Sequence, residues 1–333
     1  MNEEMRHVSS NPHVRAKATT QSIMTLVVIG LLPAAGYGVY NFGVRALIIL
    51  GISIATCVLA EFLFEKLLKR KVTVGDLSAV VTGLLLGMNM PPTVPYWLPV
   101  VGGCFAIIIV KMLFGGLGQN FMNPALGARC FLLISFPVLM NNFVTDAYTG
   151  ATPLSVIKNA QAAGNIVQGL RSVNVRDMIF GNTAGVIGET SMIAIVIGAC
   201  ILILFDVIDL WVPGSYILSF LCFLVLFGPK FATGAELGVY LSAQLAGGGL
   251  MLGAFFMATD YVSCPITNRG KLIYGIFIGI MTGIFRVLGS SAEGVSYAII
   301  LGNLMTPLIE RFTVPRAFGI VKEPKAKKEV EKA

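Results

Sequence analysis

The chain has 333 residues, of which 56% are hydrophobic and only 12% are charged. Soluble domains carry about 25% charged and about 45–50% apolar residues, so this composition excludes an ordinary soluble domain and is typical of a polytopic membrane protein. The net charge of +7 does not indicate nucleic-acid binding, because the basic residues lie beside apolar runs, as they do in membrane topology signals.

The apolar segments follow one another closely, and we expect ten of them, all helical, to cross or enter the membrane. Several are shorter than the roughly 20 residues that an upright helix needs, and the short ones contain Gly and Pro. We therefore expect broken helices, which are tolerated where protein or a cavity covers the freed backbone. In chain order the segments cover residues 22–40, 44–64, 78–92, 97–114, 124–138, 190–208, 212–228, 237–258, 272–289 and 294–311.

The second half of the chain repeats a pattern of the first. Residues 83–95 (GLLLGMNMPPTVP) resemble residues 249–265 (GLMLGAFFMATDYVSCP), and each stretch precedes an apolar segment with one basic residue, Lys111 or Arg286. With five segments in each half, the second copy enters the membrane the opposite way, which is the inverted repeat of many transport proteins. Chance similarity between apolar sequences is the alternative.

Basic residues predict the orientation, because they concentrate in loops on one side and near both ends of the chain. We expect both termini in the cytoplasm and one long extracytoplasmic loop. The predicted parts are a cytoplasmic N-terminal segment (1–21), a first five-helix repeat (22–138), the loop (139–189), a second, inverted repeat (190–312) and a charged cytoplasmic tail (313–333). The tail is poor in apolar residues and is predicted to be disordered.

The predicted loop contains the run DAYTGATPLS (146–155), which is rich in small and hydroxyl-bearing residues. Pro153 restricts Thr152 to an extended conformation, and the two small residues before it lead us to expect an exposed hydroxyl. A threonine needs a base or a metal to act as a nucleophile, and Asp146 is a nearby carboxylate. The rest of the loop predicts turns and one short helix.

This run is similar to the flavinylation motif of bacterial redox-driven ion pumps: Asp, two further residues, Ser or Thr, Gly or Ser, Ala and Thr. Further stretches at 115–137, 255–271 and 293–311 resemble the RnfD/NqrB family. Its RnfD members belong to Rnf complexes, which are ion-translocating ferredoxin:NAD oxidoreductases, and its homologous NqrB members belong to sodium-pumping NADH:quinone reductases. The similarity covers nearly the whole chain and is greatest to RnfD. The matching motif positions are Asp146, Thr149, Gly150, Ala151 and Thr152.

The resemblance implies two flavins. In this family an FMN transferase joins FMN through a phosphoester to the last threonine of the motif, which implies attachment at Thr152. The family also carries a noncovalent riboflavin, and GQNFMNPA (118–125) matches the stretch that contacts it, which implies Asn120 and Asn123 as contacts. Amide side chains suit the carbonyls and ring nitrogens of an isoalloxazine. The alternative is that both residues only cap the helix opened by Pro124.

Asp76, Asp260 and Glu310 match carboxylates that the family links to cation uptake, and they are our candidates for an ion pathway. Carboxylates inside a membrane are costly and usually functional. All three lie near the ends of predicted segments, so a role as solvated flank or helix cap stays open. Arg129, inside the fifth segment, is expected to balance the charge of a flavin or to pair with an acid.

The resemblance implies a subunit of a translocase of the bacterial inner membrane, not catalytic alone, that relays electrons and contributes to Na⁺ or H⁺ transport. The sequence does not separate these ions. The implied partners are a flavin subunit with an extracytoplasmic domain, iron–sulfur and NADH-binding subunits, small membrane subunits and the FMN transferase. Two alternatives are a passive small-solute channel or transporter and a non-redox membrane anchor for redox partners; both leave the flavin motif without a role.

Overall fold

The computed structural model describes residues 19–143, 151–289 and 293–315, and this part of the chain is helical without a strand. The predicted all-helical architecture is therefore confirmed for these residues, and each predicted apolar segment contains a helix. The N-terminal segment up to residue 18 and the tail from residue 316 lie outside the described residues.

The first half of the chain forms a compact group of helices. A single glycine, Gly43 (φ +72°), turns the chain between the first two long helices. The elements are α1 (Thr20–Phe42), α2 (Val44–Leu67), the 3₁₀ turn η1 (Val74–Asp76), α3 (Ser78–Met88), α4 (Trp97–Cys104) with its π-helical continuation η2 (Phe105–Met112), α5 (Pro124–Ser135) and α6 (Pro137–Met140).

The second half has the same number of long apolar elements. Its third element breaks where Gly248 and Gly249 both adopt φ +66°, a backbone conformation that favours glycine. The elements are α10 (Met192–Leu204), α11 (Trp211–Phe227), α12 (Gly234–Ala246), α13 (Leu250–Leu252) with its π-helical continuation η3 (Gly253–Met257), α14 (Asn268–Val287) and α15 (Val295–Thr313).

The described part of the segment between the halves, from residue 151 on, contains more helix than the sequence predicted. It contains three short helices, α7 (Pro153–Ala162), α8 (Ile166–Ser172) and α9 (Val175–Phe180), where we expected one. Side chains that cap α7 and α9, Thr152 and Asn174, accept hydrogen bonds from the first free backbone amides and so stabilise helices that are too short to persist alone.

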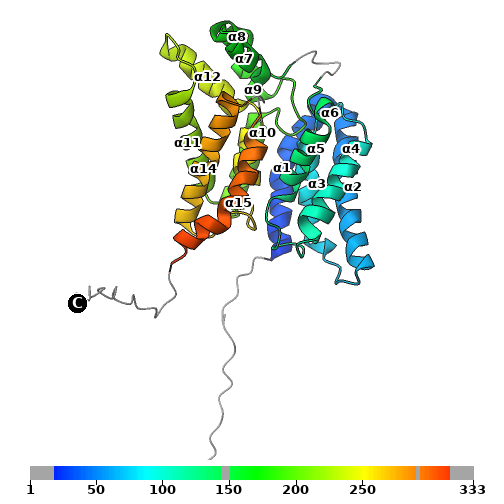
Figure 1. Ribbon diagram of the computed structural model, residues 1–333. Coiled ribbons are helices and arrows are strands. Elements are labelled where there is room, and N and C mark those ends of the chain that lie inside the picture. The colour runs from blue at the N-terminus through cyan, green and yellow to red at the C-terminus, as the bar shows by residue number, and fades with distance from the viewer. Residues whose placement is uncertain (1–18, 144–150, 290–292, 316–333) are drawn as a thin grey trace, which may run out of the picture.

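Figure 1 shows that α1 begins and α15 ends at the same end of the molecule, whereas α7 and α8 lie at the opposite end. The helices of the first half lie on one side, and α11, α12, α14 and α15 lie on the other. Helix α10 packs against α1. The contact is very close: a Cβ atom on Gly198 would lie 1.9 Å from the carbonyl oxygen of Gly30, so the backbones approach as they do at small-residue interfaces of membrane helices.

By length and composition, three of the described helices can each cross a membrane alone, namely α1, α2 and α14. Helix α12 and the α13–η3 segment pass the same test together and meet at a bend of 58°. The other apolar helices are shorter, and large apolar side chains such as Leu63, Leu226 and Phe312 are exposed on the outside. An apolar exterior around a helical core indicates a polytopic membrane protein.

Candidate functional site

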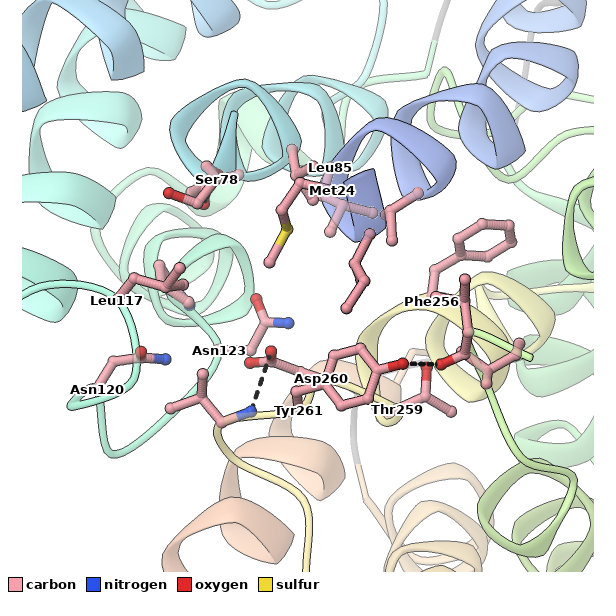
Figure 2. Close-up of a pocket in the computed structure, with 18 of the residues that line it drawn as sticks. Met24, Ser78, Leu85, Leu117, Asn120, Asn123, Phe256, Thr259, Asp260 and Tyr261 are labelled. Carbon is pink, nitrogen blue, oxygen red and sulfur yellow. Dashed lines mark hydrogen bonds between the residues drawn. The ribbon is translucent and has the colours of Figure 1, made fainter. Parts of the chain in front are cut away.

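A cavity opens near the start of α1, between α3, the start of α5 and the segment that follows η3. Its walls are mostly apolar with a few polar groups, which is the usual lining of a small-molecule site. Figure 2 shows Ser78, Asn120, Asn123 and Asp260 around this cavity. The structure therefore brings together the two predicted flavin contacts and one of the predicted ion-pathway acids.

Asn123 is the N-cap of α5, as the capping alternative predicted. Its Oδ1 accepts from the amide of Ala125 at 3.0 Å and from that of Leu126 at 3.4 Å. Its Nδ2 donates to the carbonyl of Met257 at 3.4 Å and so links α5 to the end of η3. Asn123 lines the cavity as well, with one N–H left for a ligand.

Asn120 is not a cap. Its Nδ2 donates to the carbonyl of Met122 at 2.9 Å, and no described residue donates to its Oδ1. The side chain is 6% exposed and lines the cavity. Asn120 can therefore offer an acceptor and a further donor to a ligand, which is the combination that an isoalloxazine edge requires.

The three candidate ion-pathway acids do not form one site. Asp76 accepts from the amide and the hydroxyl of Ser78, the first residue of α3, at 2.8 and 2.6 Å. Asp260 lines the cavity and accepts from Ser263 Oγ at 3.0 Å. Glu310, on α15, accepts from the amide of Ile266 at 3.2 Å. No group of three or more His, Cys, Asp or Glu side chains in the described part of the chain is arranged to hold a metal ion.

The sequence reasoning missed a buried ion pair in the wall of the cavity. Lys111 Nζ lies 2.7 Å from Glu61 Oε2, and these residues are 2% and 0% exposed. Lys111 also donates to Ser78 Oγ at 2.6 Å. The sequence contained a signal for this pair: Glu61 is a carboxylate inside the apolar run of residues 44–64. Carboxylates inside membrane segments are functional candidates by default.

Thr152 lies near the opposite end of the molecule, at the start of α7. Its backbone is extended (φ −59°, ψ 150°), as Pro153 predicted. Thr152 is half-buried and not exposed as expected. Its hydroxyl oxygen accepts from the amide of Ser155 at 3.3 Å and caps α7. The hydroxyl hydrogen is still available for donation. The recess beside Thr152 is also lined by Glu189, Thr190, Gly247, Gly248 and Glu293.

The rest of the predicted flavinylation motif is described only in part. Ala151 is exposed next to Thr152, whereas Asp146, Thr149 and Gly150 lie outside the described residues. A base from Asp146 therefore stays a prediction.

Arg129 takes part in a buried charge cluster that joins both halves. Its Nη1 donates to Glu189 Oε1 at 2.9 Å and to Asn89 Oδ1 at 2.5 Å, and its Nη2 donates to Glu293 Oε2 at 2.6 Å. Of the two roles expected for Arg129, pairing with an acid is the one observed. The side chain lines neither the cavity nor the recess, and a flavin contact stays a prediction.

Helix α7 is docked on α14 by Lys158, whose Nζ donates to the carbonyls of Arg286 and Gly289 at 3.0 and 2.5 Å. Partial burial, and then the nearby charge of Arg286, lower the pKa of Lys158. Arg286 in turn donates to the carbonyls of Gly247 and Gly248 at 2.9 and 3.0 Å, where α12 breaks. Hydrogen bonds of Lys158 and Arg286 therefore connect α7, which begins beside the recess, to the end of α14 and to the break between α12 and α13.

The residues present fit the two implied flavins. The cavity combines apolar walls such as Leu85 and Phe256 with the amides of Asn120 and Asn123, which suits a flat, mostly apolar ring with a polar edge. Thr152 places a hydroxyl at the N-terminus of a 10-residue helix, where the backbone amides favour an attached phosphate.

Comparison with known proteins gives a consistent result. Residues 7–319 match the NQR2, RnfD, RnfE family. The chain is 46% identical over 334 residues to the D component of the Na(+)-translocating ferredoxin:NAD(+) oxidoreductase complex of Acetobacterium woodii, covering 98% of this chain and 100% of that relative. It is 39% identical to the D component of the proton-translocating ferredoxin:NAD(+) oxidoreductase complex of Clostridium ljungdahlii, covering 94% and 96%. It is 36% identical to the D component of the ion-translocating oxidoreductase complex of Vibrio cholerae, covering 94% and 99%.

Proposed function

The chain belongs to the NQR2, RnfD, RnfE family, and on this premise we propose that it is the membrane component RnfD of an ion-translocating ferredoxin:NAD oxidoreductase complex. Within that complex it relays electrons through FMN on Thr152 and a riboflavin in the cavity of Asn120 and Asn123. The names of its relatives support membership of such a complex over a passive channel.

The observation that carries the proposal is the position of the two candidate flavin sites. The cavity includes Ile23 and Met24, at the beginning of α1, whereas Thr152 begins α7 near the opposite end of the molecule (Figure 1). Two electron carriers near opposite ends of a membrane protein suit electron transfer between partners on the two sides. Flavins supply the redox chemistry, and the protein positions them and tunes their potentials.

The proposal includes ten membrane segments in two inverted halves, with both termini in the cytoplasm of a bacterium and the α7–α9 segment outside. Similar polar contacts in the two halves support it. Lys111, from η2, donates to Ser78 at the start of the short helix α3, and Arg286, from α14, donates to Gly247 and Gly248 just before α13. In each half a buried cation of the fourth element thus bonds to the third element, at the start of α3 in the first half and at the break before α13 in the second, as related repeats would arrange it.

The transported ion is Na⁺ or H⁺, because the relatives' names include a sodium-translocating and a proton-translocating complex. Asp260 is the favoured ion-pathway residue, since it is the candidate acid that lines the cavity. The partners are the other subunits of the complex: flavin, iron–sulfur, NADH-binding and small membrane subunits.

The intact mass of the purified chain tests the FMN site. The chain is co-expressed with an active FMN transferase, and Thr152→Ala is compared with Thr183→Ala, which removes another threonine hydroxyl from the same recess. We expect the added mass of one FMN in the wild type and in Thr183→Ala, and its loss in Thr152→Ala. An unmodified wild-type chain would contradict the proposal and favour the channel or anchor alternatives.

A further inference from the structure

Lys111 carries more hydrogen-bonding capacity than the protein around it uses. Its ammonium group has three N–H donors. Glu61 Oε2 and Ser78 Oγ accept two of them, at 2.7 and 2.6 Å, and no other described residue accepts the third. The residue is 2% exposed and is part of the cavity wall. A buried ammonium donor without an acceptor is costly, and a ligand in the cavity would remove that cost.

The backbone around Lys111 is unusual at several places. Lys111 lies in η2, a π-helical segment, and such segments are frequent at functional sites. Leu77, beside Ser78, adopts φ +64° although it is not a glycine. Non-glycine residues in this region cost free energy and cluster at ligand sites. Together these features hold the Ser78 hydroxyl between Lys111 and the carboxylate of Asp76, 2.6 Å from each.

On the basis of the proposed function, we propose that Lys111 faces a flavin bound in the Asn120/Asn123 cavity and raises its redox potential, while Glu61 positions Lys111. Reduction adds electron density to a flavin, so a cation at the cavity wall stabilises the reduced form more than the oxidised form. Among the described residues that line the cavity, Lys111 is the cation and Asp260 the anion.

Other charged groups lie near the ion pair of Lys111 and Glu61, and the choice of variants has to take them into account. Glu65 on α2 and Asp76 in η1 are the acids that interact with Glu61, and Asp260 faces the cavity from the segment after η3. Removing Lys111 alone would leave Glu61 buried without its counter-charge, which is strongly destabilising. The double variant Glu61→Gln, Lys111→Met removes both charges with little change in volume and is the better test.

The experiment uses the full chain in detergent, in a Thr152→Ala background so that the covalent flavin is absent, titrated with riboflavin. Bound flavin is quantified, and its midpoint potential is measured by spectroelectrochemistry. Lys66→Met serves as the matched control, because Lys66 is an exposed lysine on the same helix as Glu61. We expect the double variant to lower the potential by about 59 mV or more, a tenfold change in a one-electron equilibrium constant, and the control to leave it unchanged.

If the double variant has the same flavin midpoint potential as the Thr152→Ala background, the inference is overturned. Riboflavin binding to that background would still support the proposed function. A background protein that binds no riboflavin overturns the proposed cavity and the inference with it. Should this double variant fail to fold, the more polar double variant Glu61→Gln, Lys111→Gln decides, because it also removes both charges and leaves no buried ion without a partner. A lowered potential supports the role of Lys111, and an unchanged potential excludes it.

Discussion

Arg129 on α5 and Glu189, shortly before α10, form an ion pair with 2.9 Å between Nη1 and Oε1, and their side chains are 4% and 6% exposed. The pair joins the first half of the chain to the segment between the halves. Glu293, before α15, is the second acid on the same guanidinium. The contact between the halves therefore depends on charges as well as on apolar packing.

Replacing Arg129 by Met should destabilise the protein by about 3–5 kcal/mol, because Glu189 would be left as a buried charge without a partner. Thermal unfolding of the purified chain in detergent measures the effect. Arg171→Met is the matched control, since Arg171 is exposed on α8 and should change stability by about 0.5 kcal/mol at most. Equal melting temperatures for the two variants would show that the ion pairs of Arg129 with Glu189 and Glu293 do not stabilise the fold.

Gly198→Ala should disrupt the contact between α1 and α10, because the new methyl group would lie 1.9 Å from the Gly30 carbonyl oxygen. Overpacking of this kind typically costs about 1–3 kcal/mol. Gly36→Ala on α1 is the control, as a Cβ atom there meets nothing within 4 Å, and alanine in a helix is favoured by about 0.5–1 kcal/mol. The melting temperature should be highest for Gly36→Ala, intermediate for the wild type and lowest for Gly198→Ala. A Gly198→Ala variant that melts at the wild-type temperature or above would disprove the close contact.

The cap and the attachment site at Thr152 can be separated. Asn is a good N-cap without a hydroxyl, so Thr152→Asn should prevent FMN attachment and keep α7 intact, whereas Thr152→Ala should lose both functions. Loss of the cap is worth about 1 kcal/mol of local stability. Hydrogen exchange of the α7 amides, combined with intact mass, distinguishes the variants. Faster exchange in Thr152→Asn than in Thr152→Ala would contradict the observed capping.

Asn120→Leu should weaken riboflavin binding about tenfold or more, because a buried amide contact to a ligand is worth about 1–3 kcal/mol. Asn123→Ser retains an N-cap for α5 and should weaken binding through loss of the carboxamide alone. Riboflavin titration of Thr152→Ala protein measures both effects. Asn182→Leu is the control, since Asn182 is exposed and does not line the cavity. Unchanged binding in both test variants would exclude the predicted contacts.

The sequence was sufficient to predict elements that local properties determine. Apolar runs of suitable length predicted the helices, and Pro153 predicted the extended backbone of Thr152. Pro124 and the asparagine before it predicted the start of α5, where Asn123 is indeed the cap. In each case the physical cause lies within a few residues of its effect.

Contacts that depend on packing could not be predicted in the same way. Glu189 meets Arg129, and Glu61 meets Lys111, across 60 and 50 positions of the chain. A hydropathy profile does not reveal such ion pairs, because the value for one charged residue is averaged with the values of its apolar neighbours. The extra helices of the loop were missed for another reason: they are short and depend on caps and on docking against α12 and α14.

Lys158 ties α7 to the end of α14, and Arg286 at the same end ties α14 to the break before α13. Helix α14 has 20 residues and is about 30 Å long, so it acts as a stiff rod that reaches through the molecule. A displacement of α7, whatever its origin, would therefore pull on the broken element through one helix end. Chemical modification at Thr152 and the geometry of the broken element would thus be mechanically connected through one end of α14.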